Sequence, residues 1–225
     1  MNRALLSLAI ALFSVAPVIP ALAQAPRSTN STEFPAQGAN PQSFIPKGWK
    51  IESTTQGDLN GGSSAAQGDR TPDAVLRLIN NSGDRTLLVL QKSNGQWRRI
   101  GVAPRLLLCS TCGGMLGSIQ LKIENGVILV DQLRGSREAV STLHRFRLDK
   151  ASNRLVLIGF DMEVRDRATG EETRESSNFL TGQKITEKYR ANRQRDGIEL
   201  VSRQRSTISR TTRAIETVDI AETRL

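Results

Sequence analysis

The chain has few of the side chains on which catalytic and nucleic-acid sites are usually built. Phe, Trp and Tyr together make up 4% of its 225 residues, so a platform for stacking nucleobases has little to form from. There is a single histidine, His144, and the only two cysteines are Cys109 and Cys112, too few for a closed zinc site. No nucleophile elbow, phosphate-binding P-loop or zinc-hydrolase helix motif occurs. The common hydrolase and nucleotide-binding classes are therefore disfavoured.

Long hydrophobic runs are also lacking, except at the N-terminus. There a basic start, an apolar run over residues 4–19 and the small residues Ala21 and Ala23 have the order of a secretory signal peptide. Pro17 lies within the run and Pro20 follows it directly, and the run is shorter than the ~20 apolar residues that a membrane-spanning helix needs. The next residue is Gln24 rather than cysteine, so no lipid anchor is indicated. We predict a cleaved signal peptide over residues 1–23 and a periplasmic or secreted product without a transmembrane segment.

The chain carries an excess of positive charge. It has 31 basic and 22 acidic residues, a formal net charge of +9. Removal of residues 1–23, which contain one arginine and no acidic residue, leaves 30 against 22, or +8. Outside the cytoplasm the anionic partners are phospholipid headgroups, envelope polysaccharides and acidic proteins. We therefore expect an unknown protein or an anionic envelope component as partner, and not a nucleic acid.

Short apolar segments separated by turn residues predict antiparallel β-structure. Residues 24–43 are rich in Pro, Ser, Thr, Asn and Gly and predict a disordered leader. Residues 44–225 are then expected to form one all-β domain, a meander arranged as a curled sheet, a sandwich or a partly propeller-like sheet. Asn-Gly pairs at 94–95 and 125–126 predict tight hairpin turns. The expected strands cover residues 73–79, 85–91, 118–123, 127–132, 154–165, 174–180, 184–190 and 198–209.

The strand between residues 154 and 165 has the clearest signal, because apolar residues alternate from Val156 to Val164. Residues 136–146 fit both a helical stripe and one face of a strand, and we favour the strand. In that strand His144 has the same parity as Phe146. We expect a packed histidine there rather than a metal ligand.

The loop between residues 58 and 73 has the composition of a calcium-binding loop. Calcium takes several oxygen ligands, and carboxylates and amides at alternate positions supply them. The candidate side-chain ligands are Asp58, Asn60 and Asp69, with Thr71 as a carbonyl ligand and Asp73 as the closing carboxylate. An insert of eight residues, 61–68, and Arg70 in place of glycine depart from the usual loop. The alternative is a polar turn whose Asp and Asn side chains cap backbone groups.

Cys109 and Cys112 are expected to form a disulfide in an oxidising compartment. The same spacing occurs in thiol–disulfide oxidoreductases, in which the start of a helix stabilises the first thiolate. Gly113 and Gly114 disfavour such a helix here. A structural disulfide is therefore preferred, and a periplasmic oxidoreductase that uses this pair is the alternative.

The segment 184–213 is strongly basic. It contains nine basic and three acidic residues, a net charge of +6. This charge predicts a docking surface for an anionic envelope component, and the alternative is a solvated hairpin whose charges keep an edge strand from aggregating. The candidate anion-binding residues are Lys184, Lys188, Arg190, Arg193, Arg195, Arg203 and Arg205.

Several short stretches occur together in this chain: residues 45–49, 57–60, Asp69 with Asp73, 109–114, 157–161 and 178–182. In combination they resemble secreted or lipid-anchored bacterial proteins of unknown function with FG-GAP or VCBS repeat-like segments. The resemblance implies a β-rich fold and a calcium loop related to those of integrin-type propeller repeats. It implies no particular activity.

These observations predict an exported, β-rich binding protein without catalytic activity. Its calcium-type loop is expected at residues 58–73 and its structural disulfide at Cys109 and Cys112. The alternatives are a thiol–disulfide oxidoreductase and a binding module for anionic envelope components.

Overall fold

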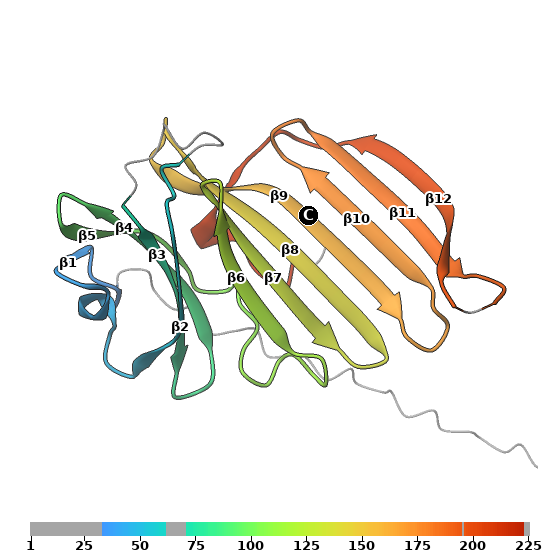
Figure 1. Cartoon of the computed structure of the whole chain (residues 1–225), viewed down its shortest axis with the longest axis horizontal. Helices are drawn as coiled ribbons and strands as arrows, with labels where there is room; N and C mark the ends of the chain where they lie inside the picture. The colour runs from blue at the N-terminus through green and yellow to red at the C-terminus, as the bar shows by residue number, and fades with distance from the viewer. Residues whose placement is uncertain (1–32, 62–70, 195, 223–225) are drawn as a thin grey trace, which may run out of the picture.

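The computed structural model describes residues 33–61, 71–194 and 196–222, and this part of the chain is nearly all β-structure (Figure 1). Sheet A contains β1 (Gln37–Gly38), β2 (Trp49–Gly57), β3 (Asp73–Asn80), β4 (Arg85–Ser93) and β5 (Gln96–Ala103) in the order β1-β5-β4-β3-β2. Sheet B contains β6 (Ser118–Glu124), β7 (Val127–Gly135), β8 (Glu138–Asp149), β9 (Arg154–Asp166), β10 (Glu172–Asn178), β11 (Gln183–Ala191) and β12 (Ile198–Thr207), each beside the next. The short β13 (Arg213–Ala214) pairs with β9, and all pairings within the sheets are antiparallel. The predicted all-β fold is confirmed.

The hairpins form where the sequence predicts them. Asn94 and Asn125 both have φ of 52°, and each is followed by a glycine that also has positive φ. Two successive left-handed residues match the right-handed twist of the flanking strands, which is why Asn-Gly is favoured between them. The ambiguous residues 136–146 lie mostly in β8, so the preference for a strand over a helix is confirmed.

The prediction of a disordered leader is wrong for residues 33–43. Phe34 is buried and contacts Trp49 with ring centroids 5.9 Å apart. β1 pairs with β5, and the 3-10 helix η2 (Pro41–Phe44) is capped by the side chain of Asn40, which accepts a hydrogen bond from Ser43 N. Polar composition misled the prediction because a single large apolar anchor orders the segment once a complementary apolar face exists. The predicted signal peptide and the remainder of the leader lie outside the described residues.

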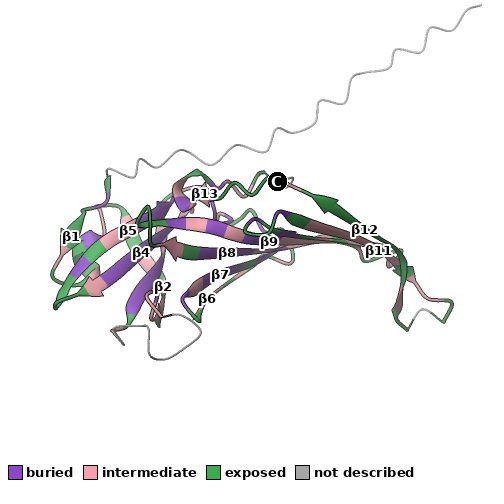
Figure 2. Cartoon of the chain, turned by 90° about the horizontal axis from the view of Figure 1, so that it is seen from above, coloured by how far each residue is buried: buried purple, intermediate pink, exposed green. Residues whose placement is uncertain are grey.

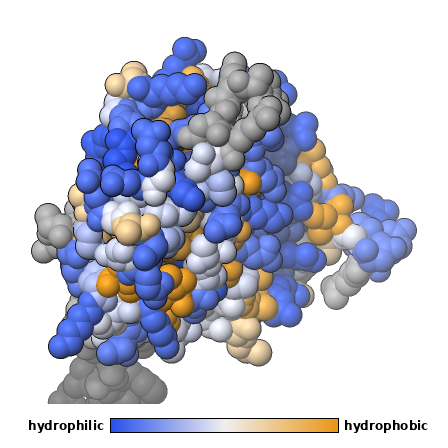
Figure 3. Space-filling model, turned by 60° about the vertical axis from the view of Figure 1, so that its left-hand side comes forward, coloured by the Kyte–Doolittle hydropathy of each residue, from blue (hydrophilic) through white to orange (hydrophobic). Residues whose placement is uncertain are grey.

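Sheet A is buried on both of its faces. One face packs against sheet B, and the other is covered by the N-terminal segment through Phe34 and Phe44. The first face contributes Val75, Leu87, Val89 and Ala103, and the second contributes Ala74, Leu76, Leu78, Leu88, Leu90 and Val102. Seen from the end formed by sheet A, the surface is mostly hydrophilic with apolar side chains in small separate groups (Figure 3). The apolar residues of β3 and β4 are therefore almost all used in the core.

Both edges of the resulting sandwich are closed. At one edge Arg77 donates to the carbonyl of Ile119 at 2.9 Å and links β3 to β6. At the other, the C-terminal segment returns from β12 and inserts Ile215, in the 3-10 helix η3 (Ile215–Thr217), and Val218 into the core. A Cβ on Gly101 would lie 2.9 Å from Leu155 Cδ1 and 3.1 Å from Ile215 Cγ2, so the glycine leaves room for both side chains. The sandwich thus contains residues from both ends of the described chain.

Sheet B extends beyond the sandwich as a single layer. β9 has 13 residues and spans roughly 40 Å, whereas β3 has 8. β10 pairs with the part of β9 between Gly159 and Arg165. We call the strands β10 to β12, residues Glu172–Thr207, the wing; buried residues concentrate in the sandwich, and the wing is largely half-buried or exposed (Figure 2). No helix in the described ranges is long and apolar enough to cross a lipid bilayer.

The N-terminal cover makes a testable contribution to stability. Substitution Phe34→Ala removes a side chain that is 2% exposed and leaves a cavity against sheet A, so we expect the free energy of unfolding to fall by about 3 kcal/mol in urea melts. Met115→Ala is the control, because Met115 is 85% exposed, and it should change stability by less than about 0.5 kcal/mol. Equal effects of the two substitutions would contradict the role of Phe34 as an anchor.

Candidate functional site

The predicted calcium loop is held by hydrogen bonds of its own side chains. Oδ1 of Asp58 accepts from the backbone N–H of Asn60 and of Gly61, both at 2.8 Å. Asp73 is fully buried; its carboxylate accepts from Leu59 N at 3.0 Å and from Lys92 N at 2.9 Å. The amide oxygen of Asn60 accepts from the Gln91 side chain at 2.7 Å. Three of the five predicted ligands therefore have oxygens engaged by protein donors and fix the turn onto β3 and β4.

Of the other two predicted ligands, the structure describes only Thr71. Thr71 is half-buried just before β3, and Asp69 lies outside the described residues. Among the residues that the structure describes, no group of three or more His, Cys, Asp or Glu side chains is arranged to hold a metal ion. Calcium at this loop stays a prediction.

Cys109 and Cys112 lie at disulfide-bonding distance, with Cα atoms 5.0 Å apart, as predicted. The residues after Cys112 continue as turns rather than as a helix, and the backbone of Gly113 accepts from Gly135 N at 2.9 Å. The helix N-terminus that stabilises a reactive thiolate in redox enzymes has no counterpart in this stretch. The geometry gives no support to the oxidoreductase alternative.

A buried glutamine fixes the loop that carries the disulfide. Gln132 on β7 is 1% exposed; its amide oxygen accepts from Leu108 N and its amide nitrogen donates to Leu106 O, both at 2.9 Å. Ser110 N donates to Gly83 O at 2.8 Å, which links the same loop to the β3–β4 turn. The loop therefore connects the two sheets, a role that its Cys and Gly content alone does not reveal.

His144 is a packed histidine, as predicted. It is 2% exposed, and its ring lies 4.7 Å from Phe160 and 6.2 Å from Phe146 between centroids. Its Nδ1 atom has no hydrogen-bond partner among the described residues. Burial, with a smaller contribution from the charge of Arg213, lowers the pKa of His144 from 6.5 to about 4. The imidazole is thus neutral at ordinary pH.

The wing has one face that continues the core side of sheet B, the inner face, and an opposite face, the open face. Directly paired residues of neighbouring strands share a face, so the register places alternate residues of β8 to β12 on the open face. A shallow hollow of about 510 Å³ lies on this face. In the wing and the adjoining parts of β8 and β9, the charged residues of the open face are Arg145, Asp161, Glu163, Arg165, Glu172, Arg174, Glu187, Arg203 and Arg205.

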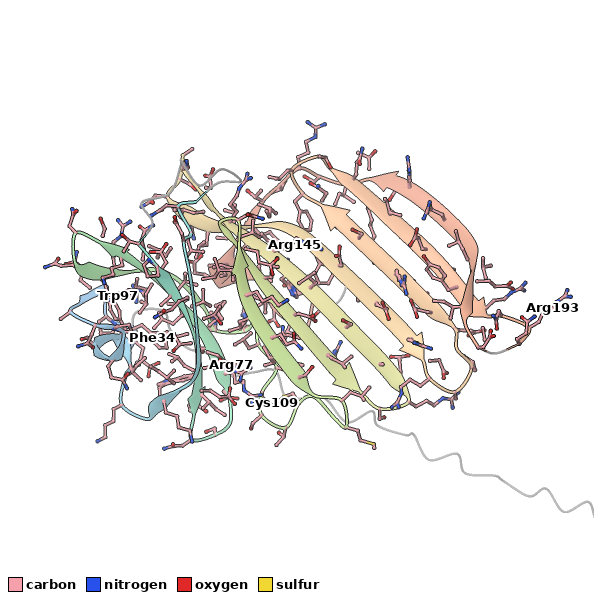
Figure 4. All side chains as sticks on the ribbon, viewed as in Figure 1. Phe34, Arg77, Trp97, Cys109, Arg145 and Arg193 are labelled. Atoms are coloured by element: carbon pink, nitrogen blue, oxygen red, sulfur yellow. A yellow bond between two sulfur atoms is a disulfide. The ribbon has the colours of Figure 1, made fainter. Side chains whose placement is uncertain are left out.

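The charges of the open face neutralise one another. Arg145 contacts Asp161 at 2.6 Å and Arg174 contacts Glu163 at 3.4 Å (Arg145 is labelled in Figure 4). Arg174 also pairs with Glu172, which is 3% exposed, and lies over the ring of Tyr189 at 4.7 Å. Both Asp161 and Glu163 are therefore paired with arginines. From β8 to β10 the open face is therefore a network of ion pairs, and on β12 it also carries Arg205, which forms no ion pair among the described residues.

The basic segment is only partly neutralised in this way. Within it Lys184 pairs with Glu175 at 2.9 Å, Arg190 with Glu199 at 2.5 Å and Arg203 with Glu187 at 2.6 Å. The hydroxyl of Tyr189 and the guanidinium of Arg203 lower the pKa of Glu187, so this carboxylate stays ionised. No ion pair within the described ranges involves Lys188, Arg193, Arg205 or Arg210. Arg195 lies outside the described residues.

The cations without an ion pair surround β12 from several directions. Lys188 is on the inner face of β11, and Arg205 is on the open face of β12. Arg193 lies in the turn that joins these strands, at the end of the molecule farthest from Phe34 and Trp97 (Figure 4), and Arg210 follows β12. The sequence identified these residues as basic, but their pairing depends on the strand register and was not predictable from composition.

Comparisons of the chain with protein-family models, with curated proteins and with solved structures each find no match. The resemblance to FG-GAP and VCBS repeat-like proteins stays a prediction.

Asp73 provides a test of the loop. Substitution Asp73→Ala leaves the buried N–H groups of Leu59 and Lys92 without their acceptor, so we expect a loss of about 2 kcal/mol in the free energy of unfolding. Asp131→Ala, at an exposed acid without an ion pair in the described chain, should be nearly neutral. The same melts with calcium and with chelator test the predicted ion: a calcium-dependent rise in Tm that disappears in Asp73→Ala supports it, and no rise rejects it.

The lowered pKa of His144 makes the stability of the fold depend on pH. Between pH 6.5 and about 4 the unfolded chain takes up a proton on His144 while the folded protein does not, so the free energy of unfolding falls as the pH is lowered through this window. The full loss is about 3 kcal/mol once the pH is below the folded pKa. Substitution His144→Phe should flatten this part of the stability profile in urea melts. An unchanged slope in that variant would show that other groups cause the dependence.

Proposed function

We propose that this chain is an exported binding protein, and that the hairpin β11–β12 docks onto an anionic component of the cell envelope. The observation that carries the proposal is a set of cations around β12 that form no ion pair with any residue the structure describes, namely Lys188, Arg193, Arg205 and Arg210. They lie on or beside the part of sheet B that extends beyond the sandwich, where the described residues are largely half-buried or exposed.

The distribution of charge over the wing supports this assignment. Arginines and carboxylates on the open face of β8 to β10 are matched in pairs, so little net charge remains there. At β11 and β12 the cations outnumber the acids, and the remaining charge is exposed. Exposed cations of one sign attract anionic partners over about 8 Å at physiological salt, which raises the rate of encounter. The net positive charge of the wing is therefore concentrated on β11 and β12, next to the nearly neutral open face of β8 to β10.

The predicted compartment is consistent with the same role. A disulfide in a chain with no other cysteine is stable in an oxidising space, and the predicted signal peptide leads to such a space. In that space the anionic partners are membrane lipids, polysaccharides and acidic proteins. A basic binding module is suited to any of these chemistries, and the binding experiment distinguishes them.

The test measures binding of the protein without its predicted signal peptide to poly-glutamate, to an anionic polysaccharide and to vesicles rich in phosphatidylglycerol, at increasing salt. We expect binding to at least one probe that weakens as salt rises, and a loss of about tenfold or more in affinity for the variant Lys188→Gln, Arg193→Gln, Arg205→Gln. The control variant Lys47→Gln, Lys50→Gln, Lys150→Gln removes the same charge from exposed positions outside the wing and should keep most of the affinity.

Two results would overturn the proposal. One is the absence of salt-sensitive binding to all three probes. The other is an equal loss in both variants, since that would mean that net charge, and not the hairpin, determines binding. Melting temperatures of both variants verify that the substitutions leave the fold intact.

A further inference from the structure

The outer strand of the wing has neighbours on one side only. β12 is the terminal strand of sheet B, and among the described residues it pairs with β11 alone. Eight of its ten residues are exposed. Leu200 and Val201, near its start, are two of the few large apolar side chains that remain exposed in the described chain, at 47% and 56%. This edge is therefore long and accessible.

The register shows which backbone groups of β12 point outward. In antiparallel pairs every second residue exchanges hydrogen bonds with the neighbouring strand, and the residues between them point the other way. Ile208 N donates to Gly182 O at 2.9 Å, which places this pair among the hydrogen-bonded ones. Counting back along the pairing Gln183–Thr207, the residues bonded to β11 are Ser206, Gln204 and Ser202. The N–H and C=O groups of Thr207, Arg205 and Arg203 therefore face the open edge.

The side chains at this edge disfavour pairing of β12 with the β12 strand of a second copy of the chain. Edge strands attract other strands, and charged side chains are one means of preventing this. In the central registers of a self-paired β12 edge, Arg203 and Arg205 of one copy lie opposite the same arginines of the other, which is destabilising. An added strand with a carboxylate opposite one of these arginines is stabilised instead, because opposite charges on paired strands attract each other.

The positions of the other cations favour the edge over a flat surface as the docking element. Lys188 and Arg205 lie on opposite faces of the sheet, so a planar membrane that contacts one of them does not contact the other. Arg193 and Arg210 lie beyond the two ends of β12. The element that all four share is the β12 edge itself. An extended polypeptide along that edge is within reach of cations on both faces and at both ends.

We propose that β12 binds an extended, acidic segment of another protein by strand addition, with the segment as a further strand of sheet B. This inference rests on the proposed function and names its partner. Outward N–H and C=O groups of Arg203, Arg205 and Thr207 form the new ladder, and an acidic residue of the partner lies against Arg205, since Arg203 already pairs with Glu187. Leu200 and Val201 offer an apolar contact at the end of the ladder.

The test separates charge from backbone pairing at one residue. Arg205→Gln removes the charge and keeps the outward N–H, whereas Arg205→Pro removes both and leaves the bonds between Gln204 and β11 in place. The probe is a peptide of alternating glutamate and threonine. We expect Arg205→Gln to weaken its binding a few-fold and Arg205→Pro to weaken it about tenfold more. Thr207→Pro should weaken binding relative to Thr207→Ala without any change in charge.

Amide hydrogen exchange supplies a second measurement that does not depend on a variant. In the free protein the amides of Arg203 and Arg205 should exchange fast, and that of Gln204 should be protected by β11. Saturation with the peptide should protect Arg203 and Arg205. This readout also applies if a proline variant fails to fold.

The outcomes distinguish the inference from the proposed function. If Gln and Pro at position 205 have equal effects and exchange at Arg203 and Arg205 is unchanged by peptide, strand addition is rejected while charge-based docking stands. If the protein binds vesicles or polysaccharide and not the peptide, the partner class is wrong. If it binds none of the anionic probes, both proposals fall.

Discussion

The rest of the structure depends on the need to cover sheet A on both faces. β3 and β4 have apolar residues at consecutive positions, Ala74–Leu76 and Leu87–Leu90, and such strands are stable only between two layers. The N-terminal segment covers one face through Phe34 and Phe44, and sheet B covers the other. Since β8 and β9 are longer than the strands that they cover, they extend past the core and provide the edge on which β10 to β12 assemble.

Local elements of the fold were predictable, and their assembly was not. The Asn-Gly turns and the alternation in β9 depend on neighbouring residues only, and both are present as expected. β2 escaped prediction because its side chains are mostly polar or small, and it forms a strand by pairing with β3. The ordered segment 33–43 depends on a distant apolar face, and composition cannot reveal such a face. The division into two sheets likewise results from contacts between residues far apart in sequence.

In the candidate site too, features set by residue type were predictable and features set by strand pairing were not. His144 and the disulfide were correctly identified from residue type and parity. The basic segment was identified as well, but which cations are neutralised depends on register: Arg203 lies directly opposite Glu187, whereas Arg205 lies opposite Ile185. Gln132 was not identified, because its importance comes from two backbone groups of a loop more than twenty residues away. Pairing geometry, rather than composition, separates charges that stabilise the sheet from those available to a partner.

The insertion of Ile215 and Val218 between the sheets affects the order in which the core forms during folding. η3 packs against β5 and β13 pairs with β9, so the strands of sheet A lack these apolar contacts until residues 213–218 have packed against them. Completion of the core therefore depends on contacts between residues more than 100 positions apart, such as Gly101 and Ile215, and non-local contacts of this kind form slowly during folding.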